Sequence, residues 1–248
     1  MKKDKLNVNV YETRKAMGEA AAADIAAAIK AALAEKDEIN MIFAAAPSQN
    51  EVLDALVNGD TEWNRVNAYH MDEYIGLDRT APQSFGNFLM DHIFGRAPFK
   101  TVNLINCGTT DPAGECARYE QLLKEHPVDI IVCGIGENGH VAFNDPWVAN
   151  FKDEALVKIV ELDEVCRQQQ VNDGCFATLD DVPKQAMTLT CPVFINAPQV
   201  FCIVPGKTKA WAIERTLNGA INEECPATLL REHDNAALYI DKDSAGLL

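Results

Sequence analysis

The sequence predicts an α/β protein with a Rossmann-like, mostly parallel sheet and helices on both faces. Short runs rich in β-branched residues alternate with longer stretches of helical periodicity, which is typical of strands joined by crossover helices. Several of the short runs are apolar, as strands covered on both sides are. No Gly/Ser-rich or Pro-rich linker divides the chain, so we expect a single domain over residues 1–248.

Six short runs have the composition of buried strands. The run from Ile130 to Cys133 is apolar at every position, as expected for a strand in the interior of a parallel sheet. The predicted strands are residues 7–11, 39–44, 65–70, 130–134, 186–190 and 199–204.

Helical periodicity fills the segments between these strands. Ile25, Ile29 and Leu33 recur at helical spacing among alanines and predict a closely packed helix. Ser48 and Glu51 have the spacing of a capping box, which predicts that a second helix begins there. The predicted helices are residues 16–36, the helix after Ser48, and residues 82–95, 115–124 and 207–217.

The charge balance excludes several classes of partner. Lys and Arg number 22 against 37 Asp and Glu, a formal net charge of −15, and no basic stripe is present. Such a chain is repelled by nucleic acid and by anionic membranes. A small anionic ligand is compatible with this charge, because it responds to a few local lysines and helix N-termini. No apolar run is long enough to span a bilayer.

Eight cysteines are spread along the chain without a CxxC pair, and several lie within apolar runs. We expect reduced core residues and neither zinc ligands nor a disulfide framework. With no secretory signal visible at the N-terminus, the sequence predicts a cytoplasmic protein.

Two polar clusters follow predicted strands, where ligands of parallel α/β sheets bind. The first, His70 to Leu77, has adjacent carboxylates at Asp72 and Glu73, a pattern that a solvated turn or a helix cap also shows. The second, Gly134 to Pro146, has three glycines that permit a tight turn, followed by an imidazole and a carboxylate. Residues 147–181 are less periodic and rich in acidic and amide side chains, which predicts a mobile flap over the carboxyl ends of the strands.

These motifs resemble the glucosamine-6-phosphate deaminase (isomerase) family, which shares its fold with 6-phosphogluconolactonases. The ending from Phe143 to Pro146 is similar to the deaminase version of the motif and not to the lactonase version. The segments that carry the resemblance, in matching order, are residues 71–77, 115–120, 136–146, 182–184, 209–210 and the tail 228–233.

The resemblance implies a role for each residue of the catalytic motif. Asp72 would be the base that moves a proton from C2 to C1 of the sugar, and His140 would shuttle protons during ring opening. Asp145 stands where the family carries a glutamate that orients the imidazole, and Asn138 stands where many deaminases carry an aspartate. An amide holds an imidazole by a hydrogen bond but does not stabilise its protonated form as a carboxylate does; alternatively, Asn138 is an allowed variant.

The phosphate site departs further from the family pattern. Residues 44–49, Ala-Ala-Ala-Pro-Ser-Gln, replace the usual Gly-Gly turn, and Ser48 with Glu51 could serve as a helix cap without a ligand. Lys209 matches the phosphate lysine of the family, whereas Arg167 aligns better with a neighbouring arginine than with the phosphate ligand. The substrate- and phosphate-binding residues implied by the resemblance are Ser48, Gln49, Glu73, Gly139, Arg167 and Lys209.

The function implied is conversion of a hexosamine 6-phosphate, first of all glucosamine 6-phosphate, with water into fructose 6-phosphate and ammonia. This chemistry moves protons only, and the sequence has no P-loop, dinucleotide fingerprint or HExxH motif, so no cofactor or metal is expected. The alternatives are an enzyme acting on galactosamine 6-phosphate or a 6-phosphogluconolactone, and a non-catalytic sugar-phosphate sensor. The sequence leaves the sugar stereochemistry, allosteric control and formation of a homo-oligomer open.

Overall fold

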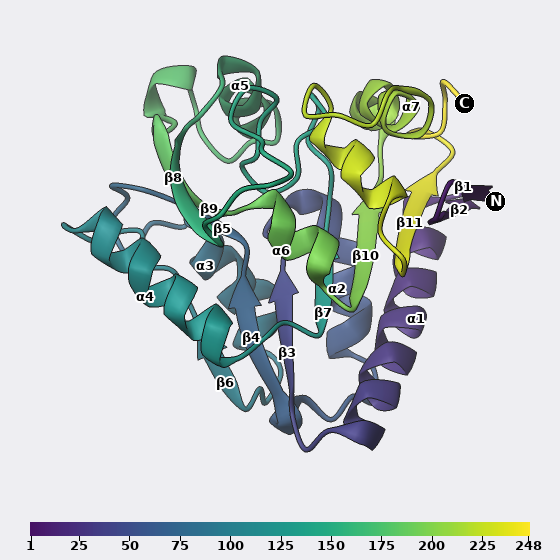
Figure 1. The fold of residues 1–248 in the computed structure, drawn as a ribbon, viewed down its shortest axis with the longest axis horizontal. Coiled ribbons are helices and arrows are strands. Elements are labelled where there is room, and N and C mark those ends of the chain that lie inside the picture. The colour runs from purple at the N-terminus through teal and green to yellow at the C-terminus, as the bar shows by residue number, and fades with distance from the viewer.

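The structure is a computed structural model that describes all 248 residues. A mostly parallel sheet runs through the centre of the protein (Figure 1). The strand order is β1-β2-β11-β10-β7-β3-β4-β6, and only the pairing of β1 with β2 is antiparallel. Strands from the two ends of the chain, β2 and β11, lie side by side. The strands are β1 (Lys2–Lys3), β2 (Leu6–Tyr11), β3 (Ile39–Phe43), β4 (Val66–His70), β6 (Thr101–Asn103), β7 (Ile130–Cys133), β10 (Gln199–Val204) and β11 (Ala236–Asp241).

A second, smaller sheet lies at the carboxyl ends of the main strands (Figure 1). It consists of β5 (Asp72–Tyr74), β9 (Gln185–Leu189) and β8 (Val157–Glu161), all antiparallel. The prediction of a strand at residues 186–190 is therefore confirmed, but its assignment to the parallel sheet is wrong. Apolar periodicity identifies a strand without identifying the partner it pairs with.

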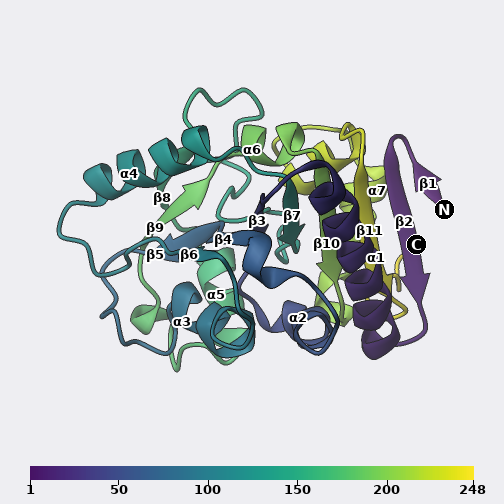
Figure 2. The same cartoon turned by 90° about the horizontal axis from the view of Figure 1, so that it is seen from below.

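Helices cover both faces of the main sheet (Figure 2), which confirms the predicted α/β class. One face packs on α1, α2 and α3, and the other on α4, α6 and α7. The helices are α1 (Arg14–Glu35), α2 (Asn50–Val57), α3 (Phe85–Leu89), α4 (Pro112–Glu125), α5 (Glu164–Asn172), α6 (Cys191–Asn196) and α7 (Ala210–Asn218).

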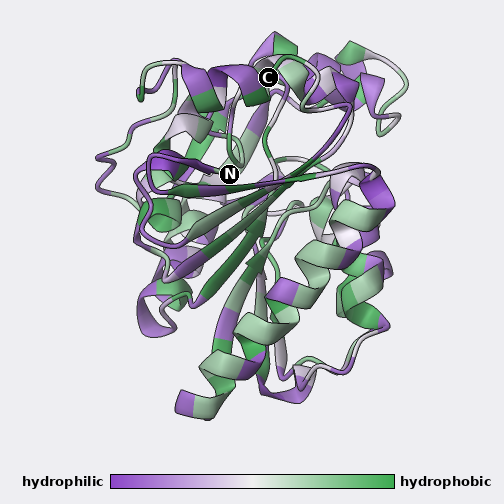
Figure 3. Cartoon of the chain, turned by 90° about the vertical axis from the view of Figure 1, so that its right-hand side faces the viewer, coloured by the Kyte–Doolittle hydropathy of each residue, from purple (hydrophilic) through white to green (hydrophobic).

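Side chains of the central strands alternate between two hydrophobic layers. In β3, Met41 and Phe43 belong to the layer beneath α1 and α2, whereas Ile42 belongs to the opposite layer. This alternation is the period of two that a pleated strand imposes, and both faces are apolar because both are covered. Figure 3 shows hydrophobic strands in the interior and hydrophilic residues concentrated at the periphery.

The predicted capping box at Ser48 and Glu51 is wrong. Pro47 begins a 3₁₀ turn, Pro47–Gln49, that runs directly into α2, so Ser48 lies inside the first turn and not at the cap. The proline ring presets helical backbone geometry at that position. Glu51 accepts a hydrogen bond from Arg14 Nε at 2.6 Å instead of closing a box.

The predicted helix at residues 82–95 is shorter than expected. It is helical from Phe85, capped by Ser84, and continues as a π-helical turn, Met90–Phe94. Strand β11 was not predicted, although Ala236 to Ile240 form a short apolar run that could have indicated it.

The eight thiols are free and six of them are buried, as expected for core cysteines. None of the helices combines the length and the apolar character needed to cross a bilayer.

Candidate active site

A cavity opens where four neighbouring strands, β4, β3, β7 and β10, reach their carboxyl ends. Its lining includes Met71 after β4, Ala44 after β3, Gly134 after β7 and Pro205 after β10. The volume is about 270 Å³, near the lower end of the range for ligand pockets. The cavity therefore suits a small ligand such as a single sugar.

Asp72 faces this cavity from β5 and not from the main sheet, because only Met71 separates β4 from β5. The residue is 7 % exposed, and Phe85 and Phe143 line the cavity beside it. Burial, together with the neighbouring carboxyl of Glu73, raises the pKa of Asp72 well above its ordinary value. No protein group donates a hydrogen bond to its carboxylate, so the carboxylate is available to a ligand group in the cavity.

His140 lies in the same cavity at the end of the turn that follows β7. The backbone N–H of Gly136 donates to the His140 carbonyl at 2.9 Å, which closes the turn. A Cβ at Gly136 would lie 2.0 Å from Cε1 of the imidazole, so only glycine leaves room for the ring. The three-glycine motif thus makes space for the histidine itself.

Asn138 and Asp145 hold the imidazole from behind. His140 Nδ1 lies 2.7 Å from Oδ1 of Asn138 and 3.1 Å from Oδ1 of Asp145. Both neighbours are acceptors, which fits a tautomer with the proton on Nδ1 and leaves Nε2 free as an acceptor toward the cavity.

The amide of Asn138 also joins two carboxylates. Its Nδ2 donates to Asp145 at 2.9 Å and to Asp163 at 3.3 Å. Burial raises the pKa of Asp145, but the contacts with His140, Asn138 and the Asp163 backbone outweigh it and hold the pKa below its ordinary value. An aspartate at 138 would instead bring a third carboxylate to this cluster, which explains the asparagine.

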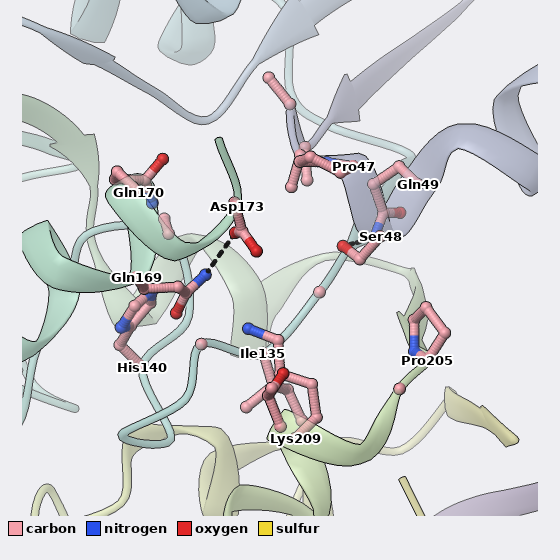
Figure 4. A pocket seen from close by; sticks show the side chains of 18 of the residues that line it. Pro47, Ser48, Gln49, Ile135, His140, Gln169, Gln170, Asp173, Pro205 and Lys209 are labelled. Atoms are coloured by element: carbon pink, nitrogen blue, oxygen red, sulfur yellow. Dashed lines mark hydrogen bonds between the residues drawn. The ribbon is translucent and has the colours of Figure 1, made fainter. Parts of the chain in front are cut away.

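The opposite end of the cavity, which we call the distal end, contains Ser48, Gln49 and Lys209 (Figure 4). Gln49 is fully buried; its Nε2 donates to Ser48 Oγ at 3.0 Å and to the Ile203 carbonyl at 3.1 Å, while its Oε1 has no partner. Lys209 is 6 % exposed, and burial lowers the pKa of its ammonium. No protein group accepts a hydrogen bond from that ammonium.

Three of the residues predicted to bind substrate do not line this cavity. Arg167 is buried and donates to the carbonyls of Leu179 and Val182, so it anchors the segment after α5. Gly139 has φ +86°, and a Cβ at this position would lie 2.5 Å from Sγ of Cys225, so Gly139 is a turn residue that has to be glycine.

Glu73 is the third of these residues. It accepts hydrogen bonds from the backbone N–H groups of Tyr74, Phe85 and Gly86, and burial raises its pKa to about 7. The N-terminus of α3 is thereby fixed, and with it the position of Phe85 in the cavity wall.

Residues 147–181 do lie over the carboxyl ends of the strands, but the segment is not irregular: it contains β8 and α5. Gln169, Gln170 and Asp173 from α5 and its C-terminal end line the cavity, and Arg14 of α1 reaches it beside Pro47. None of these four was predicted. The acidic and amide composition of the flap was the only sequence signal for the first three, and Arg14 had none.

One group of side chains has the donor atoms of a metal site. The ligand atoms of His140, Asp145 and Cys166 lie within 4.8 Å of one another and are buried. The imidazole and the carboxylate of this group already have hydrogen-bond partners in the Asn138 network. We therefore interpret these two residues as parts of that hydrogen-bond network.

Known proteins are similar to this chain over most of its length. The sequence profile described as glucosamine-6-phosphate isomerases/6-phosphogluconolactonase matches residues 12–239. The chain belongs to this family. The glucosamine-6-phosphate deaminase of Listeria monocytogenes serovar 1/2a is 36% identical over 212 residues, which is 85% of this chain and 88% of that protein. The enzyme of the same name from Streptococcus sanguinis is 34% identical over 206 residues, 83% of this chain and 86% of that protein.

Solved structures of the family have the same architecture. A monomeric glucosamine-6-phosphate deaminase superposes with a TM-score of 0.89 at 28% identity, covering 98% of this chain and 100% of that one. The 6-phosphogluconolactonase of Thermotoga maritima superposes with a TM-score of 0.79 at 20% identity, covering 96% of this chain and 100% of that one. Deaminases and lactonases of the family thus share one fold, and the cavity residues must distinguish between them.

Proposed function

We propose that the protein converts a hexosamine 6-phosphate, first of all glucosamine 6-phosphate, with water into fructose 6-phosphate and ammonia. The observation that carries this proposal is the presence, in one sugar-sized cavity, of the unpaired carboxylate of Asp72 and the oriented imidazole of His140. The deaminases from Listeria and Streptococcus support the choice of substrate.

Ring opening is the task that the imidazole geometry suits. With its proton on Nδ1, His140 presents an unprotonated Nε2 that accepts the proton of the C1 hydroxyl and returns it to the ring oxygen. Asp145 and Asn138 fix the ring plane, because both place acceptor oxygens against Nδ1, and the Asp145 carboxylate stabilises the transient imidazolium.

Isomerisation is the task of Asp72. In the open-chain sugar its carboxylate takes the proton from C2 while O1 takes a proton from the substrate ammonium, giving an enolamine. The Asp72 carboxyl then returns its proton to C1, giving a protonated ketimine. Water then adds to C2, and ammonia leaves from the resulting carbinolamine to give the ketose. A carboxylate with a raised pKa is a stronger base than an ordinary one, which suits abstraction from carbon.

The raised pKa of Asp72 has a direct consequence for pH dependence. The base works only when deprotonated, so activity falls as the pH drops through its pKa. Because that pKa lies above the ordinary carboxylate range, we expect the acid limb of kcat/KM to lie at higher pH than an exposed aspartate would give.

An assay of ammonia release and ketose formation with glucosamine, galactosamine and mannosamine 6-phosphates tests the proposal, with 6-phosphogluconolactone hydrolysis measured alongside. We expect ammonia and ketose in equal amounts from one hexosamine phosphate, and exchange of its C2 proton with solvent. Lactone hydrolysis without ammonia release would assign the protein to the other branch of the family, and binding without turnover would make it a sensor.

The free thiols fit a reducing compartment, and we propose that the reaction takes place in the cytoplasm.

A further inference from the structure

The distal end of the cavity contains a completely buried amide, that of Gln49. The residue is 0 % exposed and belongs to the cavity wall, and Figure 4 shows its side chain next to that of Ser48. Burial of an amide costs free energy unless its polar groups form hydrogen bonds. The partners of each polar group of Gln49 therefore matter.

A backbone carbonyl fixes the orientation of this amide. Nε2 donates one hydrogen to the carbonyl of Ile203, a residue of β10, at 3.1 Å. In the reverse orientation Oε1 would face that carbonyl, and two acceptors do not form a hydrogen bond. Nε2 therefore stays on this side of the amide, and its second hydrogen is donated to Oγ of Ser48 at 3.0 Å.

The contact with Gln49 determines which role is left to the hydroxyl of Ser48. An amide N–H only donates, so Oγ is the acceptor in this pair. No protein group accepts the hydrogen of the hydroxyl, and Ser48 lines the cavity. The hydroxyl therefore presents a hydrogen-bond donor to a ligand in the cavity.

Gly134 provides the space for this amide. A Cβ at position 134 would lie 3.1 Å from Nε2 of Gln49 and 3.5 Å from Oγ of Ser48, so the amide could not keep its place unchanged. Gly134 and Gly136 belong to the same three-glycine motif after β7. The first glycine thus makes room for the amide at the distal end, as the second makes room for His140.

Other donors surround Ser48 at the distal end. Lys209 has a buried ammonium without a protein acceptor, and Arg14 and Lys207 line the same cavity. Ser48 itself lies in the turn that runs into α2, where backbone N–H groups favour an anion. A hydroxyl held as a donor therefore has the same polarity as its surroundings.

We infer that Gln49 is a positioning residue for substrate binding, which holds the hydroxyl of Ser48 as a hydrogen-bond donor to the distal group of the substrate. Both amide hydrogens are used inside the protein, and the amide oxygen is buried. Gln49 therefore acts through Ser48 and not by its own contact with the ligand. The inference rests on the proposed function for the identity of the distal group, a phosphate.

The test is a double-mutant cycle on KM for glucosamine 6-phosphate. Ser48→Ala removes a hydrogen bond to a charged group and should raise KM by about 10- to 100-fold. Gln49→Met keeps the length of the side chain but leaves the hydroxyl free to rotate, so KM should rise by about 2- to 10-fold with kcat unchanged. In the Ser48→Ala background, Gln49→Met should raise KM no further, because the hydroxyl that it positions is absent.

Two further variants complete the design. Gln121→Met, on the exposed side of α4, is the matched control and should leave KM unchanged. Gly134→Ala keeps every hydrogen-bonding group but crowds the amide, and it replaces Gln49→Met if that variant does not fold. Its increase in KM should likewise disappear in the Ser48→Ala background.

The same variants are titrated calorimetrically with inorganic phosphate, which requires no turnover. We expect the dissociation constants to follow the pattern of the KM values. An equal rise from Gln49→Met with and without the Ser48 hydroxyl would overturn the inference, because the amide would then act on the fold or on the ligand directly. No rise in either background would overturn it as well.

Failure of the proposed function gives a different result. A wild-type protein that releases no ammonia from glucosamine 6-phosphate would overturn the proposed function, while the affinities for inorganic phosphate still decide the role of Gln49. A wild-type protein that binds neither compound would overturn the inference too, because the distal end would then not be an anion site.

Discussion

The two ends of the cavity differ in how completely the protein satisfies its own polar groups. At the catalytic end, the imidazole of His140 is fixed by Asn138 and Asp145, and only the carboxylate of Asp72 is left unpaired. At the distal end, the ammonium of Lys209 and Oε1 of Gln49 both lack protein partners. The catalytic end is thus organised before substrate arrives, whereas the distal end is completed by the ligand.

Among the changes considered, loss of the base at the catalytic end should have the largest effect on activity. Asp72→Asn keeps the shape but cannot accept a proton, so we expect kcat to fall by about 100-fold or more while substrate binding persists. Steady-state kinetics and exchange of the C2 proton measure this, with Asp91→Asn, an exposed residue outside the cavity, as the control. Proton exchange that persists in Asp72→Asn would assign the base to another residue.

A side chain at position 136 would fill the space that Gly136 leaves for the imidazole of His140. In Gly136→Ala the new Cβ would lie 2.0 Å from the His140 ring, so the ring must move. We expect kcat to decrease by about 100-fold, as misplacement of a catalytic group by about 1 Å does. Gly59→Ala, where the nearest atoms are 3.4 Å away, is the matched control. Equal kcat values for the two variants would show that ring position does not limit catalysis.

At the distal end, Lys209→Ala should act on binding more than on turnover. Loss of a charged hydrogen bond worth about 1.5 to 3 kcal/mol should raise KM for the phosphorylated substrate by about 10- to 100-fold. Removal of the phosphate from the substrate should then make little further difference, whereas Lys30→Ala on the exposed face of α1 leaves KM unchanged. Additive losses from the variant and from the truncated substrate would contradict contact between them.

Asn138→Asp tests why the catalytic end carries an amide. The change removes the donor to Asp145 and Asp163 and adds a third acid, so we expect a loss of about 1 to 3 kcal/mol in unfolding free energy. Asp145 normally stabilises the fold above its unfolded pKa, and this contribution disappears as the pH falls through its lowered folded pKa. The variant weakens that contribution, so the loss should be full from neutral pH down to about pH 5 and should shrink only as the pH falls below the ordinary aspartate pKa of about 3.9.

Denaturant unfolding at several pH values measures the effect. The double variant Asn138→Asp, Asp163→Asn has the same number of carboxylates in this cluster as wild type, and it should recover part of the stability. A loss that is independent of pH, or one that the second change leaves untouched, would mean that repulsion among these side chains is not its cause.

The sequence predicted the catalytic end well because its residues are close in the chain. Asn138, His140 and Asp145 belong to one turn after one strand, and local geometry alone brings them together. Gly136 was recognised as part of a tight turn, although its contact with the imidazole could be seen only in the structure.

The distal end could not be predicted in the same way. Ser48 and Lys209 line the distal end from different elements, and the direction of the Arg167 side chain depends on the carbonyls of Leu179 and Val182. Contacts between residues that are far apart in the sequence produce no periodic pattern from which they could be predicted. For the same reason the strand around residue 187 could be predicted, but not its membership of the small sheet.

The small sheet also determines how functions could be exchanged within the family. Asp72 and Asp173 both belong to the covering region made of β5, β8, β9 and α5, whereas His140 and Lys209 lie on loops that follow strands of the main sheet. Transplanting the segment from β8 to β9 from a relative would replace Gln169, Gln170 and Asp173 of the cavity wall, and with them Asp163, which contacts Asn138 and Asp145. An exchange of this covering segment therefore preserves the proton shuttle only if the incoming segment keeps an acceptor at position 163.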